Sequence, residues 1–267
     1  MDRYRLKNVI ILILLLVNVF LLGSLAYRDS AAQSAQDRAL EQLTALFAAD
    51  GIQLDPAVVP SGTPPAGHTL TRDSAFERSA AAQLLGSGLV YAERWGVYSY
   101  TSNNGTALFR DNGSFDAAGT LAASDGVAFC EDFCKKFHYE ILSSQLDGEG
   151  SGAILAVRKY SRLPVYNCTV TFTLDRGAVT SASGTLLPEV SAELSEEEPL
   201  SAQAALTAFQ AMRRESGAVA SSITEVSLCY ELQSSVAAPM SLAPAWCIVT
   251  NTLRYYVNCY TGAVSQY

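Results

Sequence analysis

The sequence has few basic residues and few histidines. Lysine and arginine together number 18 against 26 acidic residues, so the formal net charge is −8. A protein that neutralises nucleic-acid phosphates needs a basic surplus, and we therefore expect no nucleic-acid partner. His68 and His138 are the only histidines, beside six cysteines. These residues offer few ligands for a catalytic metal, and we expect neither a metal nor a cofactor.

Charge of either sign is also scarce, at 16% of the chain, and much of the hydrophobic excess lies near the N-terminus. Residues 9–26 carry no charge and are long enough to cross the hydrocarbon core of a membrane, and no second run of this length occurs. Three of the first eight residues are basic, and such residues stay on the cytoplasmic side. We expect a single-pass protein of the cell membrane, with a cytoplasmic tail (1–8), a transmembrane helix (9–26) and an extracellular remainder.

A cleaved secretory signal peptide is the competing interpretation. The apolar run ends in small residues at Ala26, which suits cleavage after that residue. Against cleavage, the Ala-, Gln- and Leu-rich sequence that follows continues as a helix up to Gly51, a residue typical of helix ends. We therefore favour an uncleaved anchor.

The amide of Asn18 falls in the middle of the expected transmembrane helix, where an unbonded polar group is costly. One interpretation is a hydrogen bond from Asn18 to a partner transmembrane helix, with Gly23 and Ser24 as small contact residues. The alternative is a single tolerated Asn in a strongly apolar helix.

Composition changes divide the chain after the anchor into four segments. Asn-Gly turns at 103–105 and 111–113, between alternating stretches, predict β-hairpins. The last two segments each begin with a helical pattern and continue with strand patterns that end in Gly-Ala-Val. Pro-containing pairs at 163–164 and 243–244 also correspond, so these segments resemble one unit used twice. The expected segments are a juxtamembrane helix and link (27–60), an N-terminal α+β unit (61–122) and two related α+β units (123–192 and 193–267).

The predicted strands alternate between apolar and polar residues, most clearly over 168–174 and 253–260. Such half-polar strands suit an antiparallel sheet with one covered face. Apolar stripes on the two predicted helices supply the cover. Their residues are Val127, Cys130, Cys134 and Phe137 in the first helix, and Leu206, Phe209 and Met212 in the second. The expected fold class is α+β, with antiparallel sheets each packed by a helix.

The spacing of Cys130, Cys134 and His138 suggests a metal site, but helix geometry argues against it. Positions i and i+8 on one helix lie about 12 Å apart, too far to share one ion. Both cysteines also fall on the apolar stripe, where a free thiol packs as a small hydrophobic group. No motif of a hydrolase, metalloprotease or phosphate-binding loop occurs either. We therefore expect no catalytic residues and no enzyme activity.

The extracellular location permits disulfides. A hairpin with its loop near 251–253 would bring Cys247 almost opposite Cys259, so this pair is the candidate bridge. The alternative is that all six cysteines are free and mostly buried.

With these features, the chain resembles the YycI/YycH-type regulatory proteins of Gram-positive bacteria. The resemblance lies in the basic start and the Leu/Asn/Phe-Leu-Leu anchor over residues 7–22. It continues in the helix, Gly-Ile turn and Pro-ended stretch over residues 43–60. The two later units are similar to PepSY-type modules, in which an Ala-rich helix is followed by strands that close on a turn such as 261–264.

The resemblance implies a non-enzymatic accessory protein that modulates a membrane sensor histidine kinase of a cell-wall-responsive two-component system. Transmembrane and extracytoplasmic contacts would alter kinase output, so the expected partners are the kinase, a second related accessory protein and the membrane. Two other classes stay open. One is a secreted or anchored PepSY-type module that binds a peptide or restrains a protease, and the other is an extracytoplasmic cell-wall hydrolase.

Overall fold

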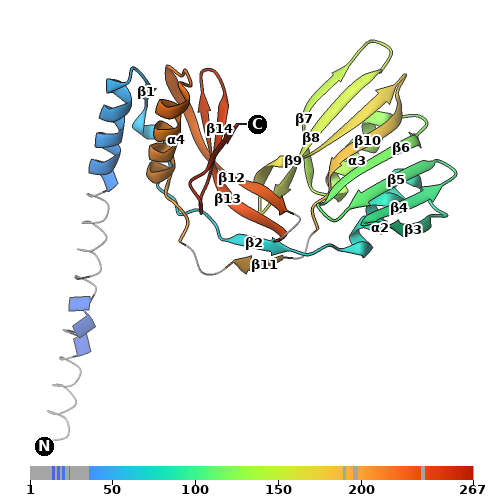
Figure 1. The fold of residues 1–267 in the computed structure, drawn as a ribbon, viewed down its shortest axis with the longest axis horizontal. Helices are drawn as coiled ribbons and strands as arrows, with labels where there is room; N and C mark the ends of the chain where they lie inside the picture. Colours follow the sequence, from blue (N-terminus) through green and yellow to red (C-terminus); the bar gives the residue numbers. More distant parts are fainter. Residues whose placement is uncertain are drawn as a thin grey trace, which may run out of the picture.

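The structure, a computed structural model, describes residues 14, 15, 17, 18, 20, 21, 24, 36–188, 191–194, 198–235 and 238–266. Residues 36–49 form a helix that precedes the labelled elements (Figure 1). After it come β1 (Gln53–Leu54), a 3-10 turn (Pro56–Val58) and β2 (Gly67–Leu70). The described chain then repeats one pattern three times, in which a helix is followed by four strands.

The three helices are α2 (Ser74–Leu85), α3 (Gly126–Lys136) and α4 (Ala202–Ser216). The strands after α2 are β3 (Val90–Arg94), β4 (Val97–Ser102), β5 (Gly105–Arg110) and β6 (Ser114–Ala122). Those after α3 are β7 (Tyr139–Leu146), β8 (Gly152–Tyr160), β9 (Leu163–Asp175) and β10 (Ala178–Thr185). β11 (Ser191–Leu194) precedes α4, which is followed by β12 (Ser222–Ser235), β13 (Ala238–Thr250), β14 (Arg254–Asn258) and β15 (Val264–Gln266).

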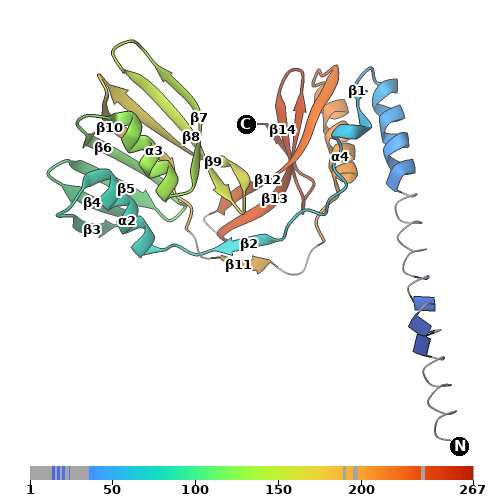
Figure 2. The same ribbon diagram turned by 180° about the vertical axis from the view of Figure 1, so that it is seen from behind.

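The first two sets of strands form one sheet, here called the N-terminal sheet. Its order is β7-β8-β9-β10-β6-β5-β4-β3, and all its pairs are antiparallel. The β6–β10 pair, from Ser114 opposite Thr185 to Ala122 opposite Val179, joins the two sets. Both α2 and α3 lie on one face of the sheet and share one core with it (Figure 2). The expectation of a separate sheet for each segment is therefore wrong for 61–122 and 123–192, because pairing between distant strands has no signature in the local pattern.

The third set forms the C-terminal sheet, in which β12, β13, β14 and β15 pair in sequence order. β1 runs parallel to β12 at one edge, and β2 lies between the start of β13 and β11. Helix α4 covers one face and buries Leu206 and Phe209 against Trp246 and Tyr255 of the sheet. This unit is the α+β layer expected from the sequence.

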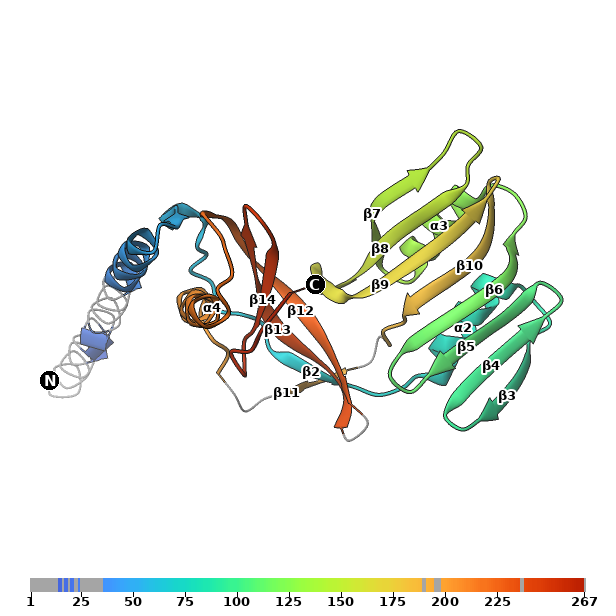
Figure 3. The same cartoon turned by 45° about the horizontal axis from the view of Figure 1, so that its top comes forward.

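Strand β9 joins the two sheets (Figure 3). Near its start, Val165 lies opposite Tyr230 of β12 in a parallel pairing, whereas the residues before and after Val165 pair with β8 of the N-terminal sheet. A small core from β2, β9, β12 and β13 fills this junction; its fully buried members include Leu70, Val165, Cys168 and Leu242. The two halves therefore share both hydrogen-bonded backbone and apolar side chains.

Several local predictions are confirmed. The hairpins at 103–105 and 111–113 are the β4–β5 and β5–β6 turns. In β9 the alternation of 168–174 buries its apolar residues, as expected. The two Gly-Ala-Val sequences, at 177–179 and 262–264, both lie at the turn between the third and fourth strands of their sets.

Three details differ from the sequence-based expectation. Val127 is 41% exposed, and Phe133 takes its place in the buried stripe of α3. The pairs at 163–164 and 243–244 are not equivalent, because the first begins β9 and the second lies inside β13. Both faces of β14 are covered, since Tyr166 of β9 stacks on Tyr256 with ring centroids 3.7 Å apart.

Candidate functional site: the helix dock and the basic cleft

The helix of residues 36–49 is fixed to α4 and the C-terminal sheet at a contact that we call the helix dock. One face of the helix points to α4, and its residues Leu43 and Phe47 are buried at 6% and 0% exposure. The Phe47 ring stacks on Phe209 of α4 with centroids 6.3 Å apart. Because Leu43 and Phe47 lie one helical turn apart on the same face, the helix packs through that face.

The end of the helix forms a Schellman motif. Gly51 has φ +75°, which is a left-handed conformation that glycine adopts without strain. The Ile52 N–H donates to the Phe47 carbonyl (2.9 Å), and the Gly51 N–H donates to the Ala48 carbonyl (3.0 Å). The predicted role of Gly51 as a helix end is confirmed. The turn also places Ile52 in the same core as Phe47 and leads directly into β1.

Asp50 carries the polar part of the helix dock. Its carboxylate accepts hydrogen bonds from Arg213 (3.0 Å) and Arg214 (2.9 Å) in the last turn of α4, and from the side chain of Gln210. A carboxylate at the C-terminal end of its own helix is disfavoured by the helix dipole, so this position needs compensation from cations. The hydrogen bond from Arg214 holds the pKa of Asp50 below its usual value.

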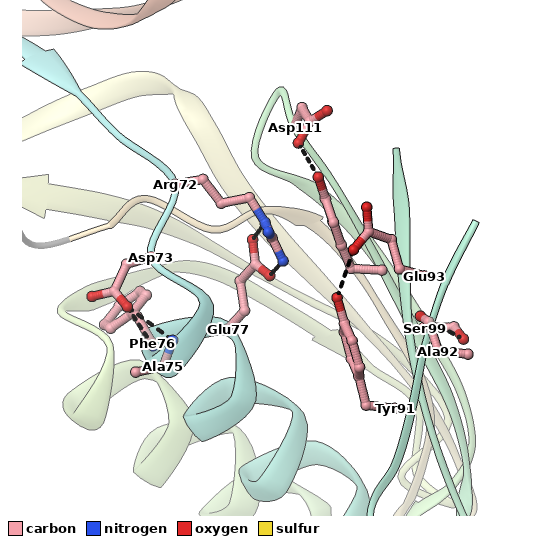
Figure 4. A network of polar contacts seen from close by, with 11 residues as sticks. Arg72, Asp73, Ala75, Phe76, Glu77, Tyr91, Ala92, Glu93, Ser99 and Asp111 are labelled. Atoms are coloured by element: carbon pink, nitrogen blue, oxygen red, sulfur yellow. Dashed lines mark hydrogen bonds and ion pairs between the residues drawn. The ribbon is translucent and has the colours of Figure 1, made fainter. Parts of the chain in front are cut away.

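A second polar network fixes the segment between β2 and α2 to the N-terminal sheet (Figure 4). Arg72 donates two hydrogen bonds to Glu77, at 2.8 and 2.6 Å. The guanidinium carbon of Arg72 lies 3.2 Å from the centre of the Tyr98 ring. Tyr98 in turn donates to Asp111 (2.7 Å), and this hydrogen bond raises the pKa of Tyr98 to about 12. Because β2 pairs with β13, the network ties the N-terminal sheet to the C-terminal one.

A basic cleft of about 580 Å³ opens between the end of α3, β8 and the β8–β9 turn. It is lined by Cys134, Lys135, His138, Tyr139, Arg158, Lys159, Tyr160, Ser161 and Arg162. Four of these nine residues are lysine or arginine and none is acidic, although the whole chain has a net charge of −8. The cleft therefore concentrates positive charge on an otherwise acidic protein.

The cations of the basic cleft differ in their surroundings. Arg158 is 2% exposed and donates from Nη1 to the Phe137 carbonyl (2.6 Å), which stabilises the C-terminal end of α3. Lys159 forms an ion pair with Glu140. Lys135 and Arg162 are exposed, and neither forms an ion pair with any carboxylate in the described part of the chain.

Strained backbone borders the cleft. Ser161 and Arg162 form a two-residue turn with φ +47° and +72°, and His138 has φ +57°. Such turns favour Asn-Gly, because both positions need positive φ. Three of the six non-glycine residues with positive φ in the described chain therefore line this one cleft. Such strain clusters at functional sites.

One wall of the cleft continues into the junction of the two sheets. The Tyr160 ring contacts His68 of β2 and Tyr230 of β12, with centroids 4.9 and 5.5 Å away. Tyr230 also donates to the Ala66 carbonyl (3.2 Å). Tyr160 thus connects the cleft with the C-terminal sheet, which carries the helix dock.

The expected transmembrane contact falls mostly outside what the structure describes. Asn18 and Ser24 are helical and exposed, whereas Gly23 lies outside the described residues. Within the described part of the chain, no helix has the length and apolar character needed to span a membrane. The anchor and the contact at Asn18 stay predictions.

The candidate bridge between Cys247 and Cys259 is not formed. Register places Cys247 opposite Tyr256, and Cys259 follows the end of β14. The two thiols belong to cores on opposite faces of the C-terminal sheet, so no rotation of the side chains can join them. All six cysteines are free and buried, as in the alternative interpretation.

The three residues that suggested a metal site differ in their surroundings, although Cys134 and His138 both line the basic cleft. Cys130 and Cys134 are in the core of the N-terminal sheet, whereas His138 is exposed beyond the end of α3. Burial raises the pKa of Cys130 to about 12 and that of Cys134 to about 11, so both thiols are protonated at neutral pH. No group of three metal-ligating side chains occurs among the described residues.

Asp50 and the basic cleft were not predicted from the sequence, although each leaves a signal in it. Asp50 is an acid at the end of a predicted helix, where the dipole disfavours it. Arg158 interrupts an apolar stretch that reads as a buried strand. A charge at such a position indicates a specific partner.

Comparisons with known proteins give structural likeness only. No family model matches the chain, and no curated protein sequence matches it. A crystal structure of an uncharacterized protein from Eubacterium rectale is similar with a TM-score of 0.44 and 9% identity, over 82% of this chain and 91% of that one. The Bacillus megaterium YpeB C-terminal domain is similar with a TM-score of 0.38 and 11% identity, over 74% of this chain and 98% of that one.

Proposed function

We propose that this chain is a non-enzymatic, membrane-anchored accessory protein that modulates a membrane sensor histidine kinase of a cell-wall-responsive two-component system. In this proposal the expected transmembrane helix (9–26), the docked helix (36–49) and the extracytoplasmic domain move as one body. The partners of the chain are the kinase and a second related accessory protein. The kinase and its pathway rest on the resemblance to YycI/YycH-type proteins. Mechanical coupling rests on the helix dock.

The helix dock is the observation that supports this function over simple tethering. A protein that only has to be held near the membrane needs no more than a flexible link after its anchor. Here the segment that follows the anchor buries Phe47 completely and pairs Asp50 with two arginines of α4. In this proposal the docked helix of residues 36–49 continues the anchor, as the sequence predicts, and passes a displacement of the outer domain to it. Such coupling changes kinase output when the helix makes different contacts with the two signalling states.

The test combines capture of the partner with loss of coupling. The full-length chain is crosslinked in membranes, the captured proteins are identified, and the N-terminus of the recovered chain is determined. We expect a kinase in the captured fraction and an intact N-terminus. Asn18→Leu should reduce capture, since it removes the only amide of the expected membrane span. A mature chain that begins after Ala26, or a captured fraction without any kinase, would contradict the proposal.

A matched pair of variants separates coupling from anchoring. Phe47→Ala should leave capture intact but weaken the response of the kinase to the outer domain, because the helix loses its buried contact. Leu46→Ala changes the neighbouring residue, which is 36% exposed, and should leave the response unchanged. Equal effects of the two variants would show that the dock transmits nothing.

The exposed edge of the N-terminal sheet favours a second candidate, a module that binds an extended peptide by strand addition. All five residues of β3 are exposed, and Val90 and Tyr91 are 68% and 50% accessible. An exposed edge strand of this kind offers unpaired backbone groups to a partner strand. Extended peptides that slow amide hydrogen exchange in β3, with the effect lost in Tyr91→Lys, would support this candidate. A library of such peptides without any effect on β3 would exclude it.

A further inference from the structure

We infer that the basic cleft binds a ligand through a phosphate group. The geometry that carries this inference is the convergence of Lys135, Arg158 and Arg162 on one open cavity. These cations come from the end of α3, from β8 and from the β8–β9 turn. The inference does not depend on the proposed function, since it concerns binding alone.

Positive charge in the cleft exceeds what the fold needs. Arg158 has a structural contact with the Phe137 carbonyl, and Lys159 is neutralised by Glu140. Lys135 and Arg162 have no acidic partner within the described chain, yet both line the same cavity. Two uncompensated cations beside a buried guanidinium favour a doubly charged anion over a single carboxylate.

Backbone strain points to the same function. Arg162 occupies a left-handed position (φ +72°) that glycine would adopt at lower cost. Arg176, in the β9–β10 turn, has the same kind of backbone (φ +49°) but lies beside Asp175 and does not line the cleft. The two turns therefore offer a matched comparison, in which only Arg162 faces the cavity.

The shape of the cleft suits a small organic phosphate. A volume of about 580 Å³ exceeds what one phosphate ion fills, and the lining includes Tyr139 and Tyr160 beside the cations. Arginine binds phosphate through paired hydrogen bonds, whereas lysine contributes a point charge. The phosphate could belong to a soluble ester or to a lipid headgroup, and the experiment distinguishes these sources.

The test is a calorimetric titration of the full-length chain in non-ionic detergent. The probes are inorganic phosphate, glycerol phosphate, succinate and mixed micelles that contain phosphatidylglycerol. We expect glycerol phosphate to bind more tightly than succinate, with an affinity that falls as added salt shortens the screening length from about 10 Å at 0.1 M to about 3 Å at 1 M. Tighter binding of the micelles assigns the phosphate to a lipid, and tighter binding of the soluble ester assigns it to a small molecule.

Variants connect binding to the cleft. Lys135→Glu and Arg162→Glu should each weaken binding of the phosphate probe by about tenfold or more. Lys136→Glu is the control for the first variant, because Lys136 bonds to Gln83 and does not line the cleft. Arg162→Gly should weaken binding of the phosphate probe without lowering the melting temperature. Arg176→Gly should leave the binding of the probe unchanged, again without lowering the melting temperature. Succinate binding as tightly as glycerol phosphate, no binding of any phosphate probe at about 10 mM, or equal effects of Lys135→Glu and Lys136→Glu would overturn the inference.

Discussion

The helix dock and the basic cleft both gather arginine and lysine side chains, but they treat charge in opposite ways. At the dock, Arg213 and Arg214 meet the carboxylate of Asp50 within 3.0 Å. At the cleft, Arg162 and Lys135 meet no carboxylate among the described residues. The first arrangement has its counter-charge built into the chain and holds two elements together. The second leaves its counter-charge to be supplied by a ligand.

The largest expected effect comes from the apolar part of the dock. Phe47→Ala removes a fully buried ring that stacks on Phe209 and should lower the free energy of unfolding of the dock by about 3–5 kcal/mol. Leu46→Ala, on the exposed side, should change it by about 0.5 kcal/mol or less. Hydrogen exchange of residues 36–49 measures both. Unchanged protection in Phe47→Ala would mean that the dock is held by Asp50 alone.

The ion pair between the half-buried Arg72 and the buried Glu77 extends the comparison to a third group of charges. Glu77→Leu leaves the Arg72 guanidinium without its carboxylate and should destabilise the chain by about 3 kcal/mol, as measured by chemical denaturation. The double variant Arg72→Met/Glu77→Leu should recover most of this loss, because no unpaired charge remains. A double variant as unstable as the single one would show that the pair is needed for packing.

The polar part of the dock should respond to acid. Because the pKa of Asp50 is lowered in the folded chain, its contribution to stability is complete above the unfolded value of 3.8 and is lost as the pH falls through the lowered pKa. Thermal melts of Asp50→Asn should therefore differ from those of the parent chain at neutral pH and converge with them in acid. Asp37→Asn, which changes an exposed carboxylate on the same helix, should show no such convergence.

The smallest expected effect concerns the two strained turns. Relief of left-handed strain is worth about 1–2 kcal/mol, and the extra chain entropy of glycine offsets about 0.5–1 kcal/mol of it. Arg162→Gly and Arg176→Gly should each raise the free energy of unfolding by about 1 kcal/mol or less, as measured by denaturant titration. A destabilised Arg162→Gly would indicate that Arg162 stabilises the free protein and is not reserved for a ligand.

Much of the local structure could be predicted from the sequence because it depends on neighbouring residues. Asn-Gly turns, the alternation in β9 and the glycine that ends the first helix all follow from local sterics and periodicity. β7 was missed, since Ser143, Ser144 and Gln145 interrupt its apolar pattern. The pairing of β6 with β10 depends on contacts between segments about 60 positions apart, for which a single sequence gives no register.

The two sites were missed for the same reason. The basic cleft forms only when the end of α3 meets the β8–β9 turn, and the pairing of Asp50 with α4 spans 160 positions. In each case the residues look unremarkable in their own segments. A charge that conflicts with its local setting, such as Asp50 or Arg158, was the only trace of the distant partner.

The pairing of early segments with late ones also sets the order in which the molecule can be completed. β1 and β2 pair with β12 and β13, and the core that buries Phe47 takes most of its side chains from α4 and the strands that follow it. The helix of residues 36–49 therefore comes early in the chain but docks last, and contacts so distant in sequence make folding slow. A chain that lost its final strands would leave that helix undocked. A docked helix 36–49 then marks only molecules in which α4 and the C-terminal sheet have been synthesised and folded.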